Sequence, residues 1–215
     1  MKLYIGNQNY SSWSLRGWLI FAQNNIQVDV VKLTLFTDEF YQSLQAVSPA
    51  AKVPALVDND VAIWDSLAIL EYINESVLDG KAWPQNQSLR GKARALACEM
   101  HSGFGALRNE LPMNCRAIRK VDLSDSAKKD IARVDAMWSE QMTQNPNAWL
   151  FGDWSIADAM YAPLALRFKT YQIELSDLAR QYQEKVLKSE AIQQWLAEAS
   201  LEADIVEEDE AGTDV

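Results

Sequence analysis

The chain has 215 residues, 48% of them hydrophobic, and a formal net charge of −10. This length suits one large domain or two small ones, and the hydrophobic content is enough for a well-filled core, which excludes general disorder. An acidic chain repels phosphate backbones, so nucleic acid is a disfavoured partner. No apolar run reaches the roughly 18 residues that a membrane-spanning helix needs, so we expect no membrane partner.

The small numbers of cysteine and histidine residues restrict the kinds of site that the chain can form. Cys98 and Cys115 are too few for a disulfide framework in a chain of this length, and there is one histidine. Neither residue type has zinc-like spacing, so we expect no metal. The sequence enters a strand-like stretch at once, without the pattern of a signal peptide. We therefore expect a cytoplasmic protein with reduced thiols.

The first third alternates short apolar runs with helical periodicity. Turn signals such as Gly6-Asn7 and Asp58-Asn59-Asp60 separate these runs. The patterns predict strands at 2–5, 28–33, 55–57 and 61–64, and helices at 14–24, 38–46 and 66–75. The order βαβαββα is that of a thioredoxin-like layer.

The second half changes character after a stretch rich in turn-forming residues. We interpret residues 1–78 as one domain, 79–87 as a linker and 88–201 as an all-helical domain without strands. Its predicted helices cover 89–111, 124–143, 155–171 and 189–201, with a shorter one near 176–182. The tail, 202–215, carries seven acidic residues and no basic ones. Such a composition predicts disorder.

Three short motifs lie at the edges of predicted elements in the first domain. Ser11, Ser12 and Ser14 come before or at the start of a helix, where a hydroxyl can cap the backbone or donate to an anion. Pro54 precedes a strand, which is a common place for proline. Asp65 and Ser66 open a helix and both suit an N-cap. Each motif taken alone is compatible with a purely structural role.

Together, these motifs resemble the glutathione-binding half of the soluble glutathione transferases. The stretch Tyr10-Ser-Ser-Trp-Ser-Leu-Arg16 is similar to the Ser-Ser-Cys-Ser-aromatic-Arg motif of the zeta class and its bacterial relatives. The resemblance implies a thioredoxin-like domain followed by a helical bundle. By the zeta pattern the catalytic hydroxyl belongs to Ser11, and by the theta pattern to Ser12. Trp13 replaces the zeta-class cysteine, which argues against cysteine chemistry and puts a zeta-type isomerase reaction in doubt.

The resemblance also implies the glutathione contacts. We expect a cis Val53–Pro54 bond, with the backbone of Val53 pairing with the cysteinyl unit of glutathione. Lys52 would lie near the glycine carboxylate. Asp65 would bind the γ-glutamyl ammonium, and Ser66 the neighbouring carboxylate.

In the helical half, Ser155-Ile-Ala-Asp158 resembles the capping box that starts the buried helix of this family. We expect this box to act in folding. His101, Phe104 and Arg108 are spaced to share one helix face, which either packs in an interface or lines the second-substrate pocket together with Trp13. Arg167 is a weaker candidate of the same kind. The aromatic rings at 138, 149, 154 and 195 are expected in the core.

The sequence therefore predicts a serine-type glutathione transferase, with glutathione as co-substrate. The thiolate would add to, or displace a group at, an electrophilic carbon of a small hydrophobic or anionic substrate. The family resemblance implies a homodimer. Two alternatives stay open. One is a glutathione-dependent cis–trans isomerase of the maleylacetoacetate type, and the other is a non-catalytic binding or scaffold protein with this fold.

Overall fold

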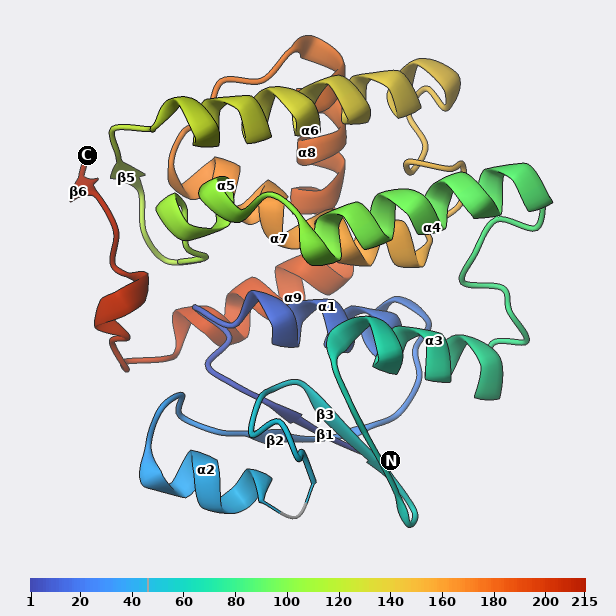
Figure 1. Ribbon diagram of the computed structural model, residues 1–215, viewed down its shortest axis with the longest axis vertical. Helices are drawn as coiled ribbons and strands as arrows, with labels where there is room; N and C mark the ends of the chain where they lie inside the picture. Colours follow the sequence, from blue (N-terminus) through green and yellow to red (C-terminus); the bar gives the residue numbers. More distant parts are fainter. Residues whose placement is uncertain (46) are drawn as a thin grey trace.

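The N-terminal domain of the computed structural model is a four-stranded sheet with helices on both sides (Figure 1). The structure describes residues 1–45 and 47–215. The strands follow the order β2-β1-β3-β4; β1 pairs parallel with β2 and antiparallel with β3, which pairs antiparallel with β4. Their bounds are β1 Lys2–Ile5, β2 Asp29–Lys32, β3 Ala55–Asp58 and β4 Val61–Trp64.

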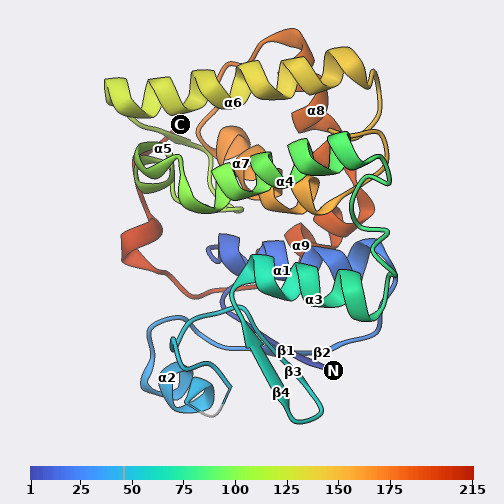
Figure 2. The same ribbon diagram turned by 45° about the vertical axis from the view of Figure 1, so that its right-hand side comes forward.

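Two helices cover the inner face of this sheet and one covers the outer face. Helices α1 (Ser12–Gln23) and α3 (Ser66–Ser76) lie between the sheet and the second domain, and α2 (Asp38–Leu44) lies on the opposite side (Figure 2). Helix α1 packs against α3 and also against the helical domain. The start of α1 is thus placed where the two domains meet. The end of the predicted helix 38–46 includes residue 46, which lies outside the described residues.

The second domain is helical, as expected. Its helices are α4 Gln87–Ser102, α5 Gly105–Glu110, α6 Asp125–Gln144, α7 Ile156–Thr170, α8 Asp177–Lys188 and α9 Glu190–Ser200. In the part of the chain that the structure describes, none of the helices combines the length and the apolar character needed to cross a membrane.

The predicted single helix 89–111 was wrong, because the chain breaks between α4 and α5. Phe104 adopts a left-handed backbone conformation, with φ of 56°. The guanidinium of Arg108 turns back and donates to the carbonyl oxygens of His101 (3.4 Å) and Gly103 (3.2 Å). These contacts satisfy carbonyl groups that a helix end leaves free. The sequence could not reveal this break, because the helical spacing of apolar residues continues across it.

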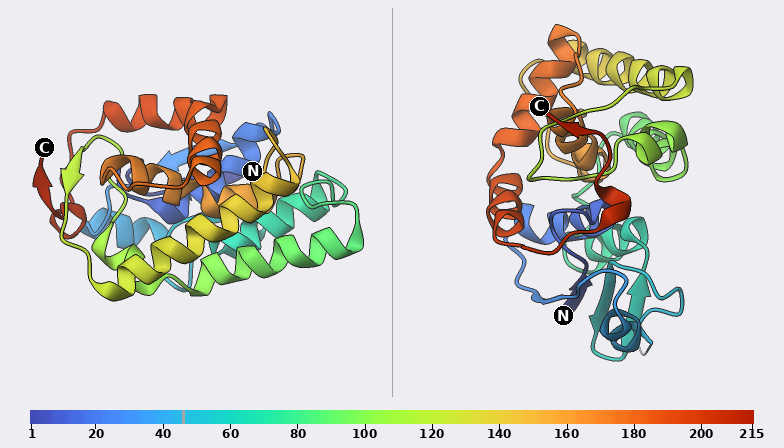
Figure 3. Two further views of the ribbon diagram at one scale, coloured as in Figure 1. Left: turned by 90° about the horizontal axis from the view of Figure 1, so that it is seen from above. Right: turned by 90° about the vertical axis from the view of Figure 1, so that its left-hand side faces the viewer.

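The expectation of a disordered acidic tail was also wrong. After α9 the tail passes the start of α1, forms the short 3-10 helix η1 (Glu207–Asp209) and ends in β6 (Thr213–Asp214) (Figure 3). Strand β6 pairs antiparallel with β5 (Arg119–Lys120), although we had predicted no strand in this half. Two-residue strands are too short to leave a periodic signal. The tail is held by the buried side chain of Val206 and by the polar partners described below.

The core of the helical domain includes the aromatic rings expected there. Trp138 and Trp195 are completely buried, while Trp149 and Trp154 pack against the core from partly exposed positions. The Ser155–Asp158 box begins α7 as expected. The buried carboxylate of Asp158 accepts from the Ser155 N–H (2.9 Å) and hydroxyl (3.0 Å) and from the Tyr182 hydroxyl (3.0 Å). It also accepts from the Leu150 N–H (3.1 Å), so it joins α7, α8 and the loop before α7.

Candidate functional site

The serine cluster forms the first turn of α1. Ser11 is the N-cap residue, and its Oγ accepts from the Ser14 N–H at 3.4 Å and donates to Ser14 Oγ at 2.7 Å. Ser14 Oγ in turn accepts from the Gly6 N–H at 3.0 Å. The hydroxyls of Ser11 and Ser14 thus tie the helix start to the end of β1.

Ser12 has a different partner, contributed by the other domain. Its Oγ accepts a hydrogen bond from the Arg167 guanidinium (Nη2 to Oγ, 3.0 Å). Arg167 is only 6% exposed and also donates to the carbonyl oxygens of Arg108 (3.0 Å) and Leu111. Burial lowers the pKa of Arg167 to about 10, which leaves it charged at neutral pH. A charged donor therefore lies behind the Ser12 hydroxyl.

Trp13, which replaces the cysteine of the zeta motif, is surrounded by cations. The Cζ atoms of Arg16 and Arg108 lie 4.4 Å and 4.8 Å from its ring centroid, within the range of cation–π contacts. The His101 ring packs edge-on at 5.5 Å. Burial, followed by repulsion from Arg167 and Arg108, lowers the pKa of Arg16 to about 9. Burial also lowers the pKa of Arg108.

The start of α3 presents the Asp-Ser pair. Asp65 is the N-cap: its Oδ1 accepts from the N–H groups of Leu67 (2.9 Å) and Ala68 (3.3 Å), and its φ is 76°. Its Oδ2 lies 3.3 Å from His101 Nε2. Ser66 is fully buried, and its Oγ has no hydrogen-bond partner among the described residues. A buried hydroxyl left unpaired at a helix N-terminus is suited to an anionic ligand.

The proline corner brings the motifs together. The Val53–Pro54 bond is cis, as the family resemblance implied. A Cβ built on Gly17 of α1 would lie 2.9 Å from Pro54 Cγ and 4.0 Å from Ile69 of α3, so α1, the corner and α3 are in close contact. Lys52 beside it is exposed. Across residues 1–45 and 47–215, neither backbone group of Val53 is paired in a hydrogen bond.

The second-substrate residues named from the sequence come together in part. Trp13, His101 and Arg108 meet as described, although the helix break means that they do so without sharing one helix face. Phe104 instead turns into the core, where it is 7% exposed and packs against Tyr161. Arg16 is a residue of this cluster that we did not predict. An arginine among the apolar residues of α1 was the signal that could have identified it.

The acidic tail lies against the loop that precedes the serines, which sequence reasoning also missed. Glu202 accepts from the backbone N–H groups of Gln8 (2.8 Å) and Asn9 (3.0 Å) and pairs with Lys32 (3.3 Å). Glu210 accepts from the Tyr10 hydroxyl at 2.5 Å. These hydrogen bonds and this ion pair fix the loop and the tail against each other.

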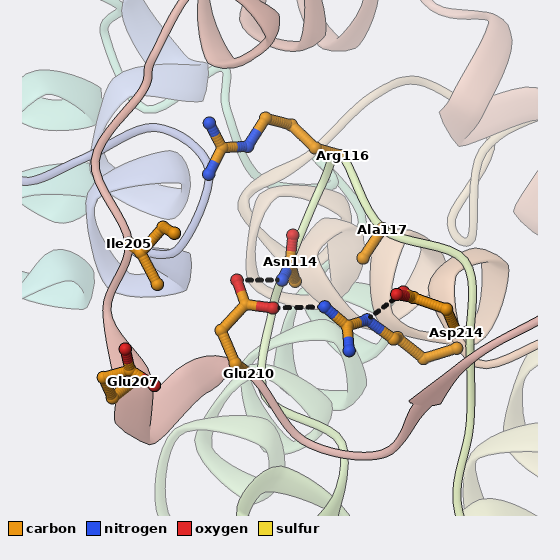
Figure 4. Close-up of a pocket in the computed structure, with 8 residues that line it drawn as sticks. Asn114, Arg116, Ala117, Ile205, Glu207, Glu210 and Asp214 are labelled. Carbon is orange, nitrogen blue, oxygen red and sulfur yellow. Dashed lines mark hydrogen bonds and ion pairs between the residues drawn. The ribbon is translucent and has the colours of Figure 1, made fainter.

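A cavity of about 490 Å³ opens between this tail and the segment after α5 (Figure 4). Glu210 bonds there to Asn114 and Arg119, and Arg119 pairs with Asp214. The cavity lies outside the serine cluster. Within the described residues, no group of three or more His, Cys, Asp or Glu side chains is placed to hold a metal ion.

Comparison with known proteins agrees with this arrangement. Residues 10–76, which contain all three motifs, match the family model for the N-terminal domain of glutathione S-transferase. By this match, the chain contains the N-terminal domain of the glutathione S-transferase family at residues 10–76. Zeta-class proteins are among its relatives. It is 27% identical over 177 residues to the probable maleylacetoacetate isomerase of Caenorhabditis elegans, covering 81% of each chain.

Solved structures of glutathione transferases share the fold over nearly the whole length of this chain. One is a glutathione transferase homologue from Burkholderia with bound glutathione (TM-score 0.72, 20% identity, 93% of this chain and 97% of the other). Another is a bacterial zeta-class maleylpyruvate isomerase (TM-score 0.71, 19% identity, 96% and 100%). The expected fold class, a thioredoxin-like domain followed by a helical bundle, is confirmed.

Proposed function

We propose that this chain binds glutathione between the starts of α1 and α3 and activates its thiol for attack on an electrophilic carbon. The observation that carries the proposal is the contact of three motifs around Pro54. On adjoining elements, the Ser66 hydroxyl and the Val53 backbone have no hydrogen-bond partner among the described residues. A ligand with one carboxylate and one extended peptide backbone satisfies these groups together.

The binding roles follow from the chemistry of each group. Asp65 binds the γ-glutamyl ammonium, and Ser66 binds the adjacent carboxylate at the N-terminus of α3. Val53 pairs with the cysteinyl backbone in the manner of an added strand. Lys52, which is exposed, meets the glycine carboxylate. This arrangement directs the thiol toward the serines at the start of α1.

The serine acts as a hydrogen-bond donor in this proposal. A free thiol titrates near pH 8.5, and the thiolate is the nucleophile. A hydroxyl donor and the N-terminus of α1 favour the charged form, and each unit by which they lower the thiol pKa corresponds to about 1.4 kcal/mol. The thiolate sulfur then forms a bond to carbon. In a transfer reaction the leaving group departs with the electron pair of its bond; in an addition the neighbouring carbon takes up a proton.

The arginine cluster favours a second candidate, a glutathione-dependent cis–trans isomerase of the maleylacetoacetate type. Near the start of α1 lie the guanidinium groups of Arg16, Arg108 and Arg167. An anionic substrate there would meet several cations. The curated relative named above bears an isomerase name. In that reaction the thiolate adds to a double bond, the resulting single bond rotates, and elimination returns the thiolate.

The proposal is tested by titrating bound glutathione from pH 5 to pH 10 and recording thiolate absorbance in the ultraviolet. We expect saturable binding and a thiol pKa well below the free value. Binding with an unshifted thiol pKa would replace catalysis by the binding or scaffold alternative. If glutathione does not bind, the proposed function is wrong and only the fold assignment stands.

The two reactions are separated by the substrate that the loaded protein consumes. An aryl halide releases halide in the transfer reaction, whereas a cis-enoic dicarboxylate is converted to its trans isomer without loss of glutathione. The homodimer is part of the proposal, and sedimentation velocity of the same preparation measures it.

A further inference from the structure

The hydroxyls of Ser11 and Ser12 differ in the direction of their hydrogen bonds. A serine hydroxyl has one proton to donate. The proton of Ser11 is directed to Ser14 Oγ at 2.7 Å, and the lone pairs of Ser11 receive the Ser14 N–H. To donate to a thiolate, Ser11 would have to break the network that caps α1.

Ser12 is in the opposite situation. Its oxygen accepts from Arg167 at 3.0 Å, and among the described residues its proton has no acceptor. Ser12 is 5% exposed and lies in the first turn of α1, where backbone N–H groups also favour an anion. A hydroxyl whose oxygen accepts from a cation becomes a stronger donor, because successive hydrogen bonds polarise one another.

The position of the Arg167 guanidinium is fixed by hydrogen bonds to backbone carbonyl groups. Its Nη1 donates to the carbonyl oxygens of Arg108 and Leu111, at the end of α5, so the guanidinium spans the gap between α5 and α1. Its Nε is buried without a partner in the described part of the chain. No described carboxylate lies within ion-pair distance of Arg167, and the charges that act on it are first the Asp209 carboxylate of the tail and then the guanidinium of Arg108. Its positive charge therefore acts on the serine hydroxyl to which it donates.

We propose that Ser12 is the hydroxyl that holds the glutathione thiolate, and that Arg167 is a positioning residue that orients and polarises it. This inference rests on the proposed function, since it concerns the same thiol. Ser11 then has a structural role as the cap of α1. The assignment follows the theta-like spacing, although the surrounding motif is zeta-like.

The test is the thiol pKa of bound glutathione in single variants and in one double variant. We expect Ser12→Ala to return the thiol pKa toward about 8.5, the free value, with at least a tenfold loss of thiolate at neutral pH. Ser12→Thr keeps the hydroxyl and should keep the lowered pKa. Ser11→Ala should lower the stability of the protein but leave the thiol pKa low. Arg167→Met should raise the thiol pKa, and Arg167→Lys should restore part of the effect.

The double variant Ser12→Ala/Arg167→Met identifies how Arg167 acts. If Arg167 works through Ser12, removing both shifts the thiol pKa no further than Ser12→Ala alone. Full additivity would show that Arg167 acts independently of the serine and would overturn the positioning role. Retention of a low thiol pKa in Ser12→Ala, or its loss in Ser11→Ala, would overturn the assignment of Ser12.

Arg167 is buried, so its variants can fail to fold. In that case the guanidinium resonances of Arg167 are followed by nitrogen NMR in the serine variants. We expect Ser12→Ala to shift them and Ser11→Ala to leave them in place, and the reverse result would overturn the inference. A wild-type protein that leaves the glutathione thiol unshifted removes the proposed function and this inference together, whereas a shifted thiol that ignores Ser12 removes this inference alone.

Discussion

His101 Nε2 lies 3.3 Å from Asp65 Oδ2, which joins the last turn of α4 to the first turn of α3 across the two domains. The other oxygen of Asp65 is occupied as the helix cap. A glutathione ammonium would therefore share Oδ2 with an imidazole already in place. The proposed γ-glutamyl site would therefore be built jointly by both domains.

The charge of Asp65 can be separated from its capping role. Asparagine is as good an N-cap as aspartate, so Asp65→Asn should keep α3 intact while removing the negative charge. One hydrogen bond to a charged group is worth about 1.5–3 kcal/mol, so we expect the Kd of glutathione to rise roughly ten- to hundredfold. Calorimetric titration measures this.

The control is a glutathione analogue that lacks the γ-glutamyl amino group. Wild type and Asp65→Asn should bind this analogue with similar affinity. If the substitution weakens both ligands by the same factor, Asp65 does not recognise the ammonium and acts on the site indirectly.

Glu202 is expected to hold the loop before the serines. Its carboxylate receives the backbone N–H groups of Gln8 and Asn9, both of them on buried residues. Glu202→Ala leaves these donors without their partner, at a cost of about 1–3 kcal/mol for each group that stays buried. Amide hydrogen exchange at residues 8 and 9 should accelerate, and the free energy of unfolding should fall. Glu208→Ala is the matched control, because Glu208 is an exposed acid of the same tail. Equal exchange in the two variants would contradict the role of Glu202.

Gly17 is expected to be essential for the contact between α1 and the proline corner. An added Cβ would lie 2.9 Å from Pro54 Cγ, closer than atoms pack, so Gly17→Ala must push α1 away from the corner. Such overpacking costs about 1–3 kcal/mol. At Gly91, in α4, the same added atom meets no described residue within 4 Å. Gly91→Ala should therefore stabilise the protein by about 0.5–1 kcal/mol, through helix propensity alone. Urea unfolding of both variants measures the contrast; a change of the same sign in both would argue against the close packing.

Asp158 is expected to make stability depend on pH below neutrality. Burial raises the pKa of this carboxyl from 3.8 to about 6, despite its four donors. A raised folded-state pKa favours the protonated form, so this contribution to stability is fully present below pH 3.8 and is lost as the pH rises to about 6. The two pKa values differ by roughly two units, which corresponds to about 3 kcal/mol.

The slope of unfolding free energy against pH between 4 and 6 measures this contribution. Asp158→Asn should reduce the slope by the contribution of one titrating proton. It should also lower stability at every pH, because the NH₂ group of the asparagine amide is a donor placed among four hydrogen-bond donors. Asp153→Asn, at an exposed acid nearby, should keep the wild-type slope. Burial raises the pKa of Asp209 to about 6 as well, so Asp209 contributes to the slope in the same pH range. The variant Asp209→Asn measures this contribution. Equal slopes in wild type and Asp158→Asn would refute the assignment.

Local patterns predicted the first domain well. The predicted strands and helices of residues 1–78 match the observed order, because each is a short run bounded by turn residues. The Ser155–Asp158 box was readable for the same reason, since its partners lie three residues apart. The errors have two causes. The break after α4 is stabilised by Arg108, which is close to it in the chain, but the helical spacing of apolar residues continues across the break. The tail is ordered by contacts with residues far away in the chain.

The sequence by itself determined which chemical groups the site contains, namely the serines, the Val-Pro corner and the Asp-Ser helix start, because these motifs are local. Only the tertiary structure decided how the groups are used. Ser12 and Arg167 are 155 residues apart and meet because α1 packs on α7. The direction of a hydrogen bond depends on which donor reaches which oxygen. Helix packing sets that distance, and no spacing along the chain encodes it.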